Sequence, residues 1–169
     1  MNGQHIFQVA SLLGNAKLDH FAMVVHSREK TVEFLSRLGF GPFRRFDYPS
    51  QAFVYGKPST YLLHVALVRF GTEFDLEIIE TEGDNEVHNR FLREHGEGIE
   101  HVAFEVQDLE VSIAAFEAAG FPLILARQVG KPGSVYMDTT AVGGTITELI
   151  RKGFKPDDPA TWPWNMNET

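Results

Sequence analysis

Four residues of types that bind divalent metal ions occur at matching places in the two halves of the chain. They are His20 and Glu77 in the first half, and His101 and Glu148 in the second. Two imidazoles and two carboxylates that converge on one point would bind a first-row divalent metal and leave positions for water or substrate. Because the chain has no cysteine, any metal site must use His, Asp or Glu.

An internal repeat places these residues in register. Residues 18–40 align with residues 99–121 without a gap, at a constant offset of 81 residues. The identical pairs are His20 and His101, Ala22 and Ala103, Val25 and Val106, Glu29 and Glu110, and Gly39-Phe40 and Gly120-Phe121. A lone histidine or glutamate in a strand is more often a structural or surface residue, so the repeat carries the metal hypothesis. The remaining histidines lack this support and are predicted to be surface or pocket residues: His5, His26, His64, His88 and His95.

Each copy of the repeat reads as a strand followed by a helix. Residues 18–25 and 99–106 are short, apolar and rich in β-branched or aromatic side chains, which is typical of strands. Each helix is expected to begin at an N-cap residue and to end at a glycine. The N-caps are Ser27 and Asp108, and the glycines are Gly39 and Gly120.

Alternation along the strands predicts which side chains face the site. Large apolar residues at 21, 23 and 25, and at 102, 104 and 106, are expected to pack on the helices. His20 and His101 then point to the opposite face. A buried carboxylate without a partner is strongly disfavoured, and a metal would explain Glu77 and Glu148 in their apolar segments.

Further strand-like segments follow each helix. They are residues 61–70 and 74–80 in the first half, and 134–138 and 145–150 in the second. The first half has about ten more residues, which we place in a loop at 49–59. The expected fold class is therefore α+β, with two βαβββ modules that form a mixed-sheet partial barrel around a metal site.

These elements divide the chain into five segments. They are an N-terminal extension at 1–17, a first βαβββ module at 18–83, a connecting helix and linker at 84–98, a second βαβββ module at 99–151, and a Pro/Trp-rich tail at 152–169. The extension has an amphipathic pattern made by Ile6, Val9, Leu12 and Leu13. In the tail, Trp162 and Trp164 are expected to pack on the domain or to cover a partner.

Composition excludes several classes of function. The chain has 23 acidic and 15 basic residues, a net charge of −8, and no basic face of the kind that neutralises phosphates, so no nucleic-acid partner is expected. No run approaches the roughly 18 apolar residues of a membrane helix. The N-terminus also lacks the pattern of a secretory signal, so we expect a cytoplasmic protein with no membrane partner.

Paired βαβββ modules with this His/Glu/His/Glu pattern resemble the vicinal oxygen chelate superfamily, which includes glyoxalase I, extradiol dioxygenases and methylmalonyl-CoA epimerase. The resemblance covers about residues 16–151. Within it, LDHFAMVV, DLEIIE, GGTITELI and especially NRFLREHGEGIEHVAFEVQDLE are similar to the epimerase branch, which typically reads FLxxxGEGIHHIAFEVDD there. Carried over residue by residue, His20, Glu77, His101 and Glu148 match the four metal ligands of the family.

This resemblance implies a metal-dependent isomerase or epimerase with one divalent ion, Co, Ni, Mn or Zn. Such an ion acts as a Lewis acid and stabilises the charge that develops when a proton leaves the carbon next to a carbonyl. The resemblance also implies a small-molecule substrate, of which a CoA thioester is one candidate, and a homodimer. A glyoxalase I-like isomerase or a lyase on another small acid is an alternative. A metal-free, bleomycin-resistance-like protein that sequesters a ligand is an alternative of another class.

The chain departs from the epimerase branch in one respect. The resembled epimerases have a second, non-ligand glutamate after the first helix, whereas no glutamate occurs here between Glu33 and Glu73. Asp47 is the only acidic residue in that interval, so the candidate catalytic residues are Glu148 and Asp47. We favour Glu148, because Asp47 lies among residues typical of an exposed rim. Two acidic residues on the ligand faces of their strands could serve instead, namely Asp75 and Glu105.

Overall fold

A computed structural model describes residues 12–71, 74–127, 131–141 and 143–155. A strand, a helix and three further strands follow one another twice, with one helix between the two sets. The first set is β1 (Lys17–Val24), α2 (Arg28–Arg37), β2 (Arg44–Val54), β3 (Lys57–Phe70) and β4 (Phe74–Gly83). After α3 (Glu86–His95), the second set is β5 (Gly98–Val106), α4 (Leu109–Ala118), β6 (Leu123–Arg127), β7 (Ser134–Met137) and β8 (Ile146–Arg151).

The two repeat helices, α2 and α4, begin and end at the predicted residues. The Ser27 hydroxyl and the Asp108 carboxylate each accept a hydrogen bond from the backbone N–H three residues later. Each helix is followed closely by a glycine with positive φ, Gly39 at 93° and Gly120 at 89°. Glycine adopts this conformation without the Cβ clash that other residues meet, so it ends both helices at equivalent points.

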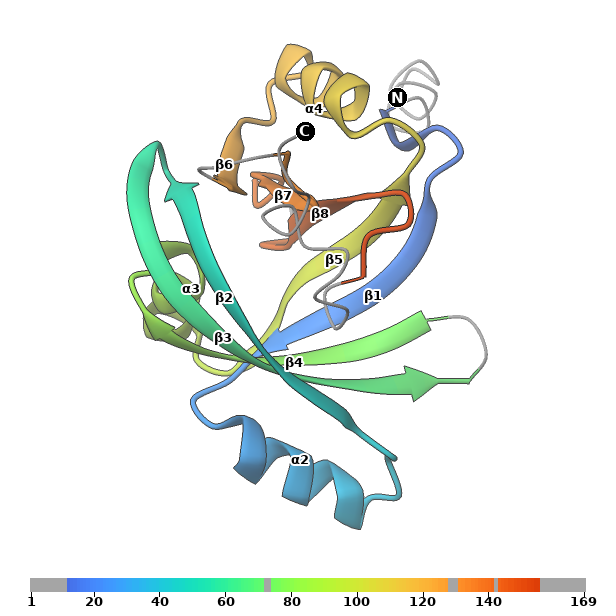
Figure 1. The fold of residues 1–169 in the computed structure, drawn as a ribbon, viewed down its shortest axis with the longest axis vertical. Helices are drawn as coiled ribbons and strands as arrows, with labels where there is room; N and C mark the ends of the chain where they lie inside the picture. The colour runs from blue at the N-terminus through green and yellow to red at the C-terminus, as the bar shows by residue number, and fades with distance from the viewer. Residues whose placement is uncertain (1–11, 72–73, 128–130, 142, 156–169) are drawn as a thin grey trace, which may run out of the picture.

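The eight strands form a closed barrel in the order β1-β4-β3-β2-β6-β7-β8-β5, and β5 pairs with β1 to close it. β1 and β4 are parallel, as are β5 and β8, whereas the other neighbouring strands are antiparallel. The expected α+β class with a mixed sheet is therefore confirmed. Figure 1 shows α2 and α4 on opposite sides of the barrel, with β1 and β5 side by side between them.

Residues 49–59 do not form the expected loop. They lie in a long hairpin in which β2 and β3 pair continuously from Arg44 opposite Leu67 to Val54 opposite Lys57. Alternate residues of β2 from Ser50 to Val54 are buried, which is the period-two pattern of a strand. The prolines and the glycine of this segment indicate a loop, but burial of one strand face in the barrel outweighs them. The short strand β6 is also absent from the predicted segments.

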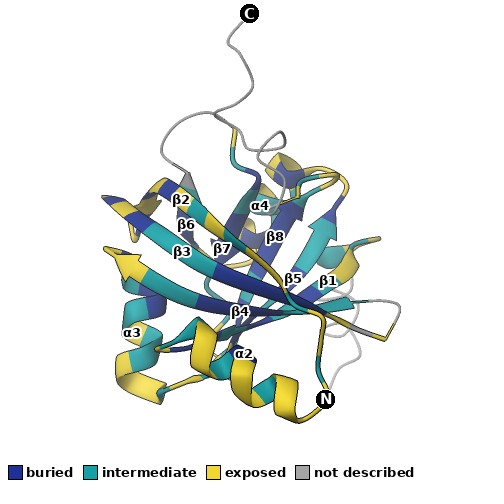
Figure 2. Cartoon of the chain, turned by 60° about the horizontal axis from the view of Figure 1, so that its bottom comes forward, coloured by how far each residue is buried: buried dark blue, intermediate teal, exposed yellow. Residues whose placement is uncertain are grey.

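Apolar layers join each repeat helix to the outside of the barrel. Met23 and Val25 pack with Val32 of α2, as the alternation predicts. In the second set, Phe116 of α4 packs with Leu149 of β8. Figure 2 shows the buried strand surfaces and the exposed outer face of α2.

The described part of the N-terminal extension packs on this second layer through Leu12 and Leu13. Ile6, Val9, Trp162 and Trp164 lie outside the described residues. None of the described helices is both long enough and apolar enough to cross a membrane.

Candidate metal centre

The two parallel strand pairs carry the predicted metal ligands at equivalent positions. On β1 and β4, Ala22 lies opposite Glu77. On β5 and β8, Ala103 lies opposite Glu148 in the same way. Each ligand histidine stands two residues before its alanine and so shares that alanine's face of the sheet. Because β1 also pairs with β5, the two pairs bring their side chains to one place inside the barrel.

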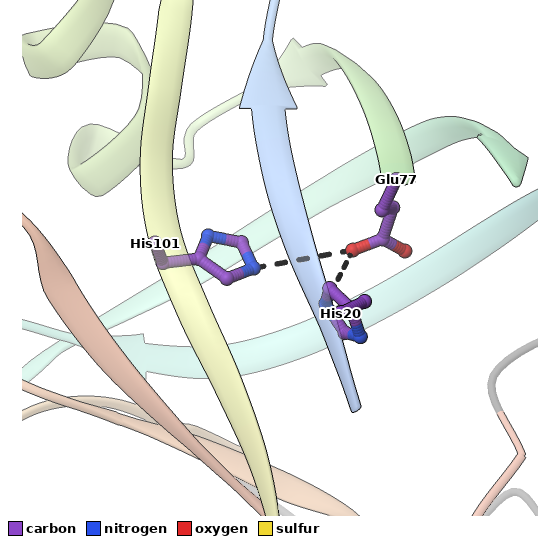
Figure 3. A group of neighbouring side chains, drawn as sticks. All are labelled: His20, Glu77 and His101. Carbon is purple, nitrogen blue, oxygen red and sulfur yellow. Dashed lines mark ion pairs between the residues drawn. The ribbon is translucent and has the colours of Figure 1, made fainter. Parts of the chain in front are cut away.

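Four side chains from four strands meet there. The Nε2 atom of His20 lies 3.1 Å from Oε2 of Glu77 and 3.2 Å from Oε2 of Glu148. The Nε2 atom of His101 lies 3.9 Å and 3.4 Å from the same two oxygens. None of the four residues is more than 6% exposed. Figure 3 shows His20, Glu77 and His101, whose ligand atoms all lie within 4.8 Å of one another.

The donor set fits a divalent metal ion. Although His20 Nε2 and Glu148 Oε2 lie 3.2 Å apart, both are buried and neither makes a hydrogen bond to any described residue. Two buried polar atoms that face each other without a hydrogen bond are what a shared cation would satisfy. Two imidazole nitrogens and two carboxylate oxygens suit Mn, Co, Ni and Zn, the metals that the sequence indicates.

Each ligand histidine is oriented by the acidic residue that precedes it. His20 donates a hydrogen bond from Nδ1 to Asp19 at 2.9 Å, and His101 donates one from Nδ1 to Glu100 at 3.0 Å. Asp19 and Glu100 are repeat-equivalent, and each falls at a register shift between β1 and β5. A bulge changes where a strand side chain points, so acid and histidine can meet. The hydrogen bond leaves Nε2 of each ring directed at the cluster.

Burial and charge act in opposite directions on these groups, and charge prevails. Burial alone would lower the pKa of His20, but the charge of Glu77 and the hydrogen bond to Asp19 raise it well above its usual value. Burial would also lower the pKa of His101, yet Glu100 and Glu148 raise it to about 9. For Glu148, the two adjacent imidazoles of His101 and His20 overcome burial and hold its pKa far below the usual range. The cluster therefore attracts a positive charge.

The structure does not bring Asp47 to this cluster. Its neighbours on β2, Phe46 and Tyr48, line the cavity, so Asp47 faces the outside of the strand. There it accepts hydrogen bonds from Arg28 at 3.1 Å and from His64 at 2.8 Å.

The two other acidic candidates also have partners away from the cluster. Asp75 accepts a hydrogen bond from Arg69 at 3.1 Å, and Glu105 accepts one from the backbone N–H of Gly153 at 3.2 Å. Neither is among the described residues that line the cavity. Glu148 is therefore the predicted catalytic residue that the structure places at the cluster.

A cavity extends from the cluster between the two strand sets. Its wall is largely apolar, and aliphatic side chains alternate there with the aromatic side chains of Phe46, Tyr48, Tyr61, Tyr136 and Phe154. The described residues that line it include no lysine or arginine.

One further histidine lines this cavity. His88 of α3 is fully buried there, whereas His26 and His95 are exposed and His5 lies outside the described residues. Sequence reasoning left His88 among the surface or pocket histidines. Its spacing from Phe91 and Leu92 places it on the apolar face of the helix, which was the available signal.

Comparisons with known structures show the same fold. A methylmalonyl-CoA epimerase in complex with methylmalonyl-CoA and ammonium has a TM-score of 0.59 at 20% identity, covering 82% of this chain and 95% of that one. A variant of the Streptomyces coelicolor methylmalonyl-CoA epimerase, in complex with 2-nitronate-propionyl-CoA, has a TM-score of 0.59 at 20% identity, and the match covers 81% of this chain and 97% of that one. The Mycobacterium tuberculosis methylmalonyl-CoA epimerase has a TM-score of 0.57 at 19% identity, and the match covers 80% of this chain and 87% of that one.

Sequence comparison shows the family. No curated protein sequence matches the chain. The model of one protein family matches residues 19–136, which run from within β1 to within β7 and include three of the four predicted ligands. The chain therefore belongs to the glyoxalase/bleomycin resistance protein/dioxygenase superfamily.

Proposed function

We propose that this protein is a divalent-metal-dependent isomerase or epimerase that moves a proton on the carbon next to a carbonyl group. One observation carries the proposal: equivalent strand pairs bring His20, Glu77, His101 and Glu148 together in a buried cluster at the end of a cavity. A divalent ion held by these residues would act as a Lewis acid on the substrate carbonyl and raise the acidity of the adjacent C–H.

Glu148 is the group that we propose takes the proton. Its Oε2 atom makes no hydrogen bond to the described residues, and its side chain lines the cavity. A carboxylate in this position can bind a metal in the resting protein. When substrate takes its place on the metal, the carboxylate is free to accept a proton at Oε2.

The cavity wall favours a substrate whose reacting carbon carries an apolar or aromatic group. Aromatic side chains surround the space next to the cluster, and they exclude water from the reacting atoms. Two of the epimerase structures named above hold acyl-CoA compounds, methylmalonyl-CoA and 2-nitronate-propionyl-CoA. The phosphates of such a thioester would have no cationic partner among the described lining residues, so they would have to lie outside the cavity. The predicted homodimer and cytoplasmic location stay predictions.

The test is metal analysis followed by hydrogen exchange. The purified protein should contain about one equivalent of Mn, Co, Ni or Zn after reconstitution. In D₂O it should then introduce one deuterium into a member of a panel of acyl-CoA and α-hydroxycarbonyl compounds, read by mass spectrometry. The Glu148→Gln variant is the matched control and should lose exchange.

Two outcomes would contradict the proposal. If the protein binds no divalent metal yet retains a ligand from the panel tightly without exchange, it is a sequestering protein. If it consumes oxygen with Fe(II) and a catechol, its chemistry is oxidative.

A further inference from the structure

A buried histidine outside the predicted ligand set is linked to the cluster through one carboxylate. His88 Nδ1 donates a hydrogen bond to Glu100, 2.8 Å from Oε2 and 3.0 Å from Oε1. The same carboxylate accepts from Nδ1 of His101 at 3.0 Å. His88, Glu100 and His101 are all 0% exposed. Glu100 therefore orients two imidazoles at once, one in the metal cluster and one outside it.

The second nitrogen of the His88 ring is left without a partner among the described residues beside the cavity. This atom, Nε2, is buried, and the side chain lines the same cavity as His20 and Glu148. The ring stacks on that of His101, with centroids 6.3 Å apart and planes at 21°. It also meets Tyr136 edge-on, with centroids 5.8 Å apart. Packing therefore fixes the ring at the cavity wall, with Nδ1 occupied by Glu100 and Nε2 left for a ligand.

Stability does not explain this arrangement. A buried polar atom without a partner costs about 1–3 kcal/mol, and burying a carboxylate such as Glu100 is itself unfavourable. The rest of this helix face is apolar, with Val87 buried and Phe91 and Leu92 packed on the barrel. An apolar residue at position 88 would continue that face and remove the need to bury Glu100. An unsatisfied atom held at a cavity by a second buried residue is what a ligand-binding group requires.

We propose that His88 contacts the substrate, with Nε2 accepting a hydrogen bond from a hydroxyl or N–H group of a molecule whose oxygens occupy the metal centre. Because Nδ1 donates its proton to Glu100, the neutral ring has its lone pair on Nε2. The substrate class is thus a chelating carbonyl compound with a hydrogen-bond donor beside its oxygens, such as an α-hydroxycarbonyl compound. Glu100 is a positioning residue for His88 and His101. This proposal rests on the proposed function.

The test compares two chelating probes that differ in a single donor. Acetohydroxamate carries an N–H group beside its two oxygens, and N-methylacetohydroxamate replaces that hydrogen with a methyl group. Dissociation constants of both probes are measured on the Co²⁺-loaded protein from the visible absorption of the metal. The affinity for Co²⁺ is measured separately by competition with a chelator.

The wild-type protein should prefer acetohydroxamate by about tenfold, the value of one well-placed hydrogen bond. His88→Phe should remove this preference while the Co²⁺ dissociation constant stays within about twofold. Glu100→Gln should reduce both the preference for acetohydroxamate and the affinity for Co²⁺, because a group that hydrogen-bonds a ligand histidine typically contributes 10–100-fold to metal affinity. His64→Gln, on the outer face of the barrel, is the matched control and should leave both unchanged.

Three results would overturn the proposal while leaving the proposed function intact. They are equal binding of the two probes by the wild-type protein, a preference that survives in His88→Phe, and a more than tenfold loss of Co²⁺ affinity in that variant. If His88→Phe does not fold, His88→Leu, which also has no acceptor, is judged by the same criteria. A wild-type protein that binds no divalent metal overturns the proposed function, and this inference with it.

Discussion

The two βαβββ sets of this barrel share one frame, the parallel pair of histidine and glutamate strands, and differ in their antiparallel hairpins. In both, the histidine strand pairs in parallel with the glutamate strand, and an alanine lies opposite the glutamate. The antiparallel hairpins differ: β2 and β3 have 11 and 14 residues, whereas β6 and β7 have five and four. The long hairpin supplies six of the residues that line the cavity. The repeat therefore builds the candidate metal centre, and the divergent hairpins shape the space for a ligand.

The frame itself differs at the second nitrogen of each ligand histidine. The side chain of Asp19, which holds His20, is 39% exposed. Glu100, which holds His101, is fully buried and also binds His88. The same position in the repeat is therefore a simple orienting group in one set and the centre of a buried network in the other.

The largest expected effect tests whether the two sets contribute equally to the metal centre. His20→Ala, His101→Ala and Glu148→Ala should each remove most of the bound divalent ion and retain the fold. A metal present at 100 times its dissociation constant stabilises the folded state by about 2.7 kcal/mol. Added metal should therefore raise the thermal unfolding midpoint of the wild type but not that of the variants, each compared with its own metal-free form in EDTA. If His20→Ala/His101→Ala still binds one equivalent tightly, the site lies elsewhere.

The next prediction compares the loss of stability when each orienting acid, Glu100 or Asp19, is replaced by alanine. Glu100→Ala leaves two buried imidazole N–H groups without their acceptor, and loss of one partner of a buried pair costs about 3–5 kcal/mol. Asp19→Ala exposes its histidine nitrogen to water and should cost less than about 1 kcal/mol. Urea unfolding of the metal-free variants measures both. Equal losses would show that burial does not distinguish the two carboxylates.

A smaller effect concerns the outer face of the long hairpin. Asp47→Asn should keep deuterium exchange within about tenfold of wild type, because Asp47 faces away from the cavity. A positioned base contributes roughly a hundredfold or more. A loss of that size at unchanged metal content would instead make Asp47 the base.

The smallest effect is the pH dependence of the Asp47–His64 pair on that face. The hydrogen bond with Asp47 raises the pKa of His64, and the same bond lowers the pKa of Asp47. The contribution of His64 to the free energy of unfolding is complete below its unfolded pKa of about 6.5, and it is lost as pH rises through the raised pKa of the folded state. The contribution of Asp47 is complete above its unfolded pKa of about 3.9, and it is lost as pH falls through the lowered pKa of the folded state.

The pair should therefore stabilise the fold most between about pH 4 and 6.5. The pair is solvent-accessible, so the difference in urea unfolding between wild type and His64→Gln should stay below about 1 kcal/mol. The difference should be larger at pH 5.5 than at pH 9. A difference that does not change between these two values would contradict the assignment.

The sequence by itself determined the repeated frame. The gapless repeat predicts the strand–helix units, their caps and the faces on which His20 and His101 lie, because these follow from local alternation and capping. The same repeat makes His20 and His101 equivalent, and the later strand pattern of the two halves predicts the same of Glu77 and Glu148. These features depend on residues near one another in the chain, which is why they can be read without the structure.

Only the tertiary structure decided what surrounds that frame. Residues 49–59 carry loop signals, and their pairing with β3 and burial of one face make them a hairpin. Glu100 enters the interior because β1 and β5 pair with a register shift, and no local pattern specifies a shift between strands 80 residues apart. His88 reaches the cavity because α3 packs beside that shift. Asp47 faces outward because its strand neighbours line the cavity, and the face of a strand is fixed by what packs on it.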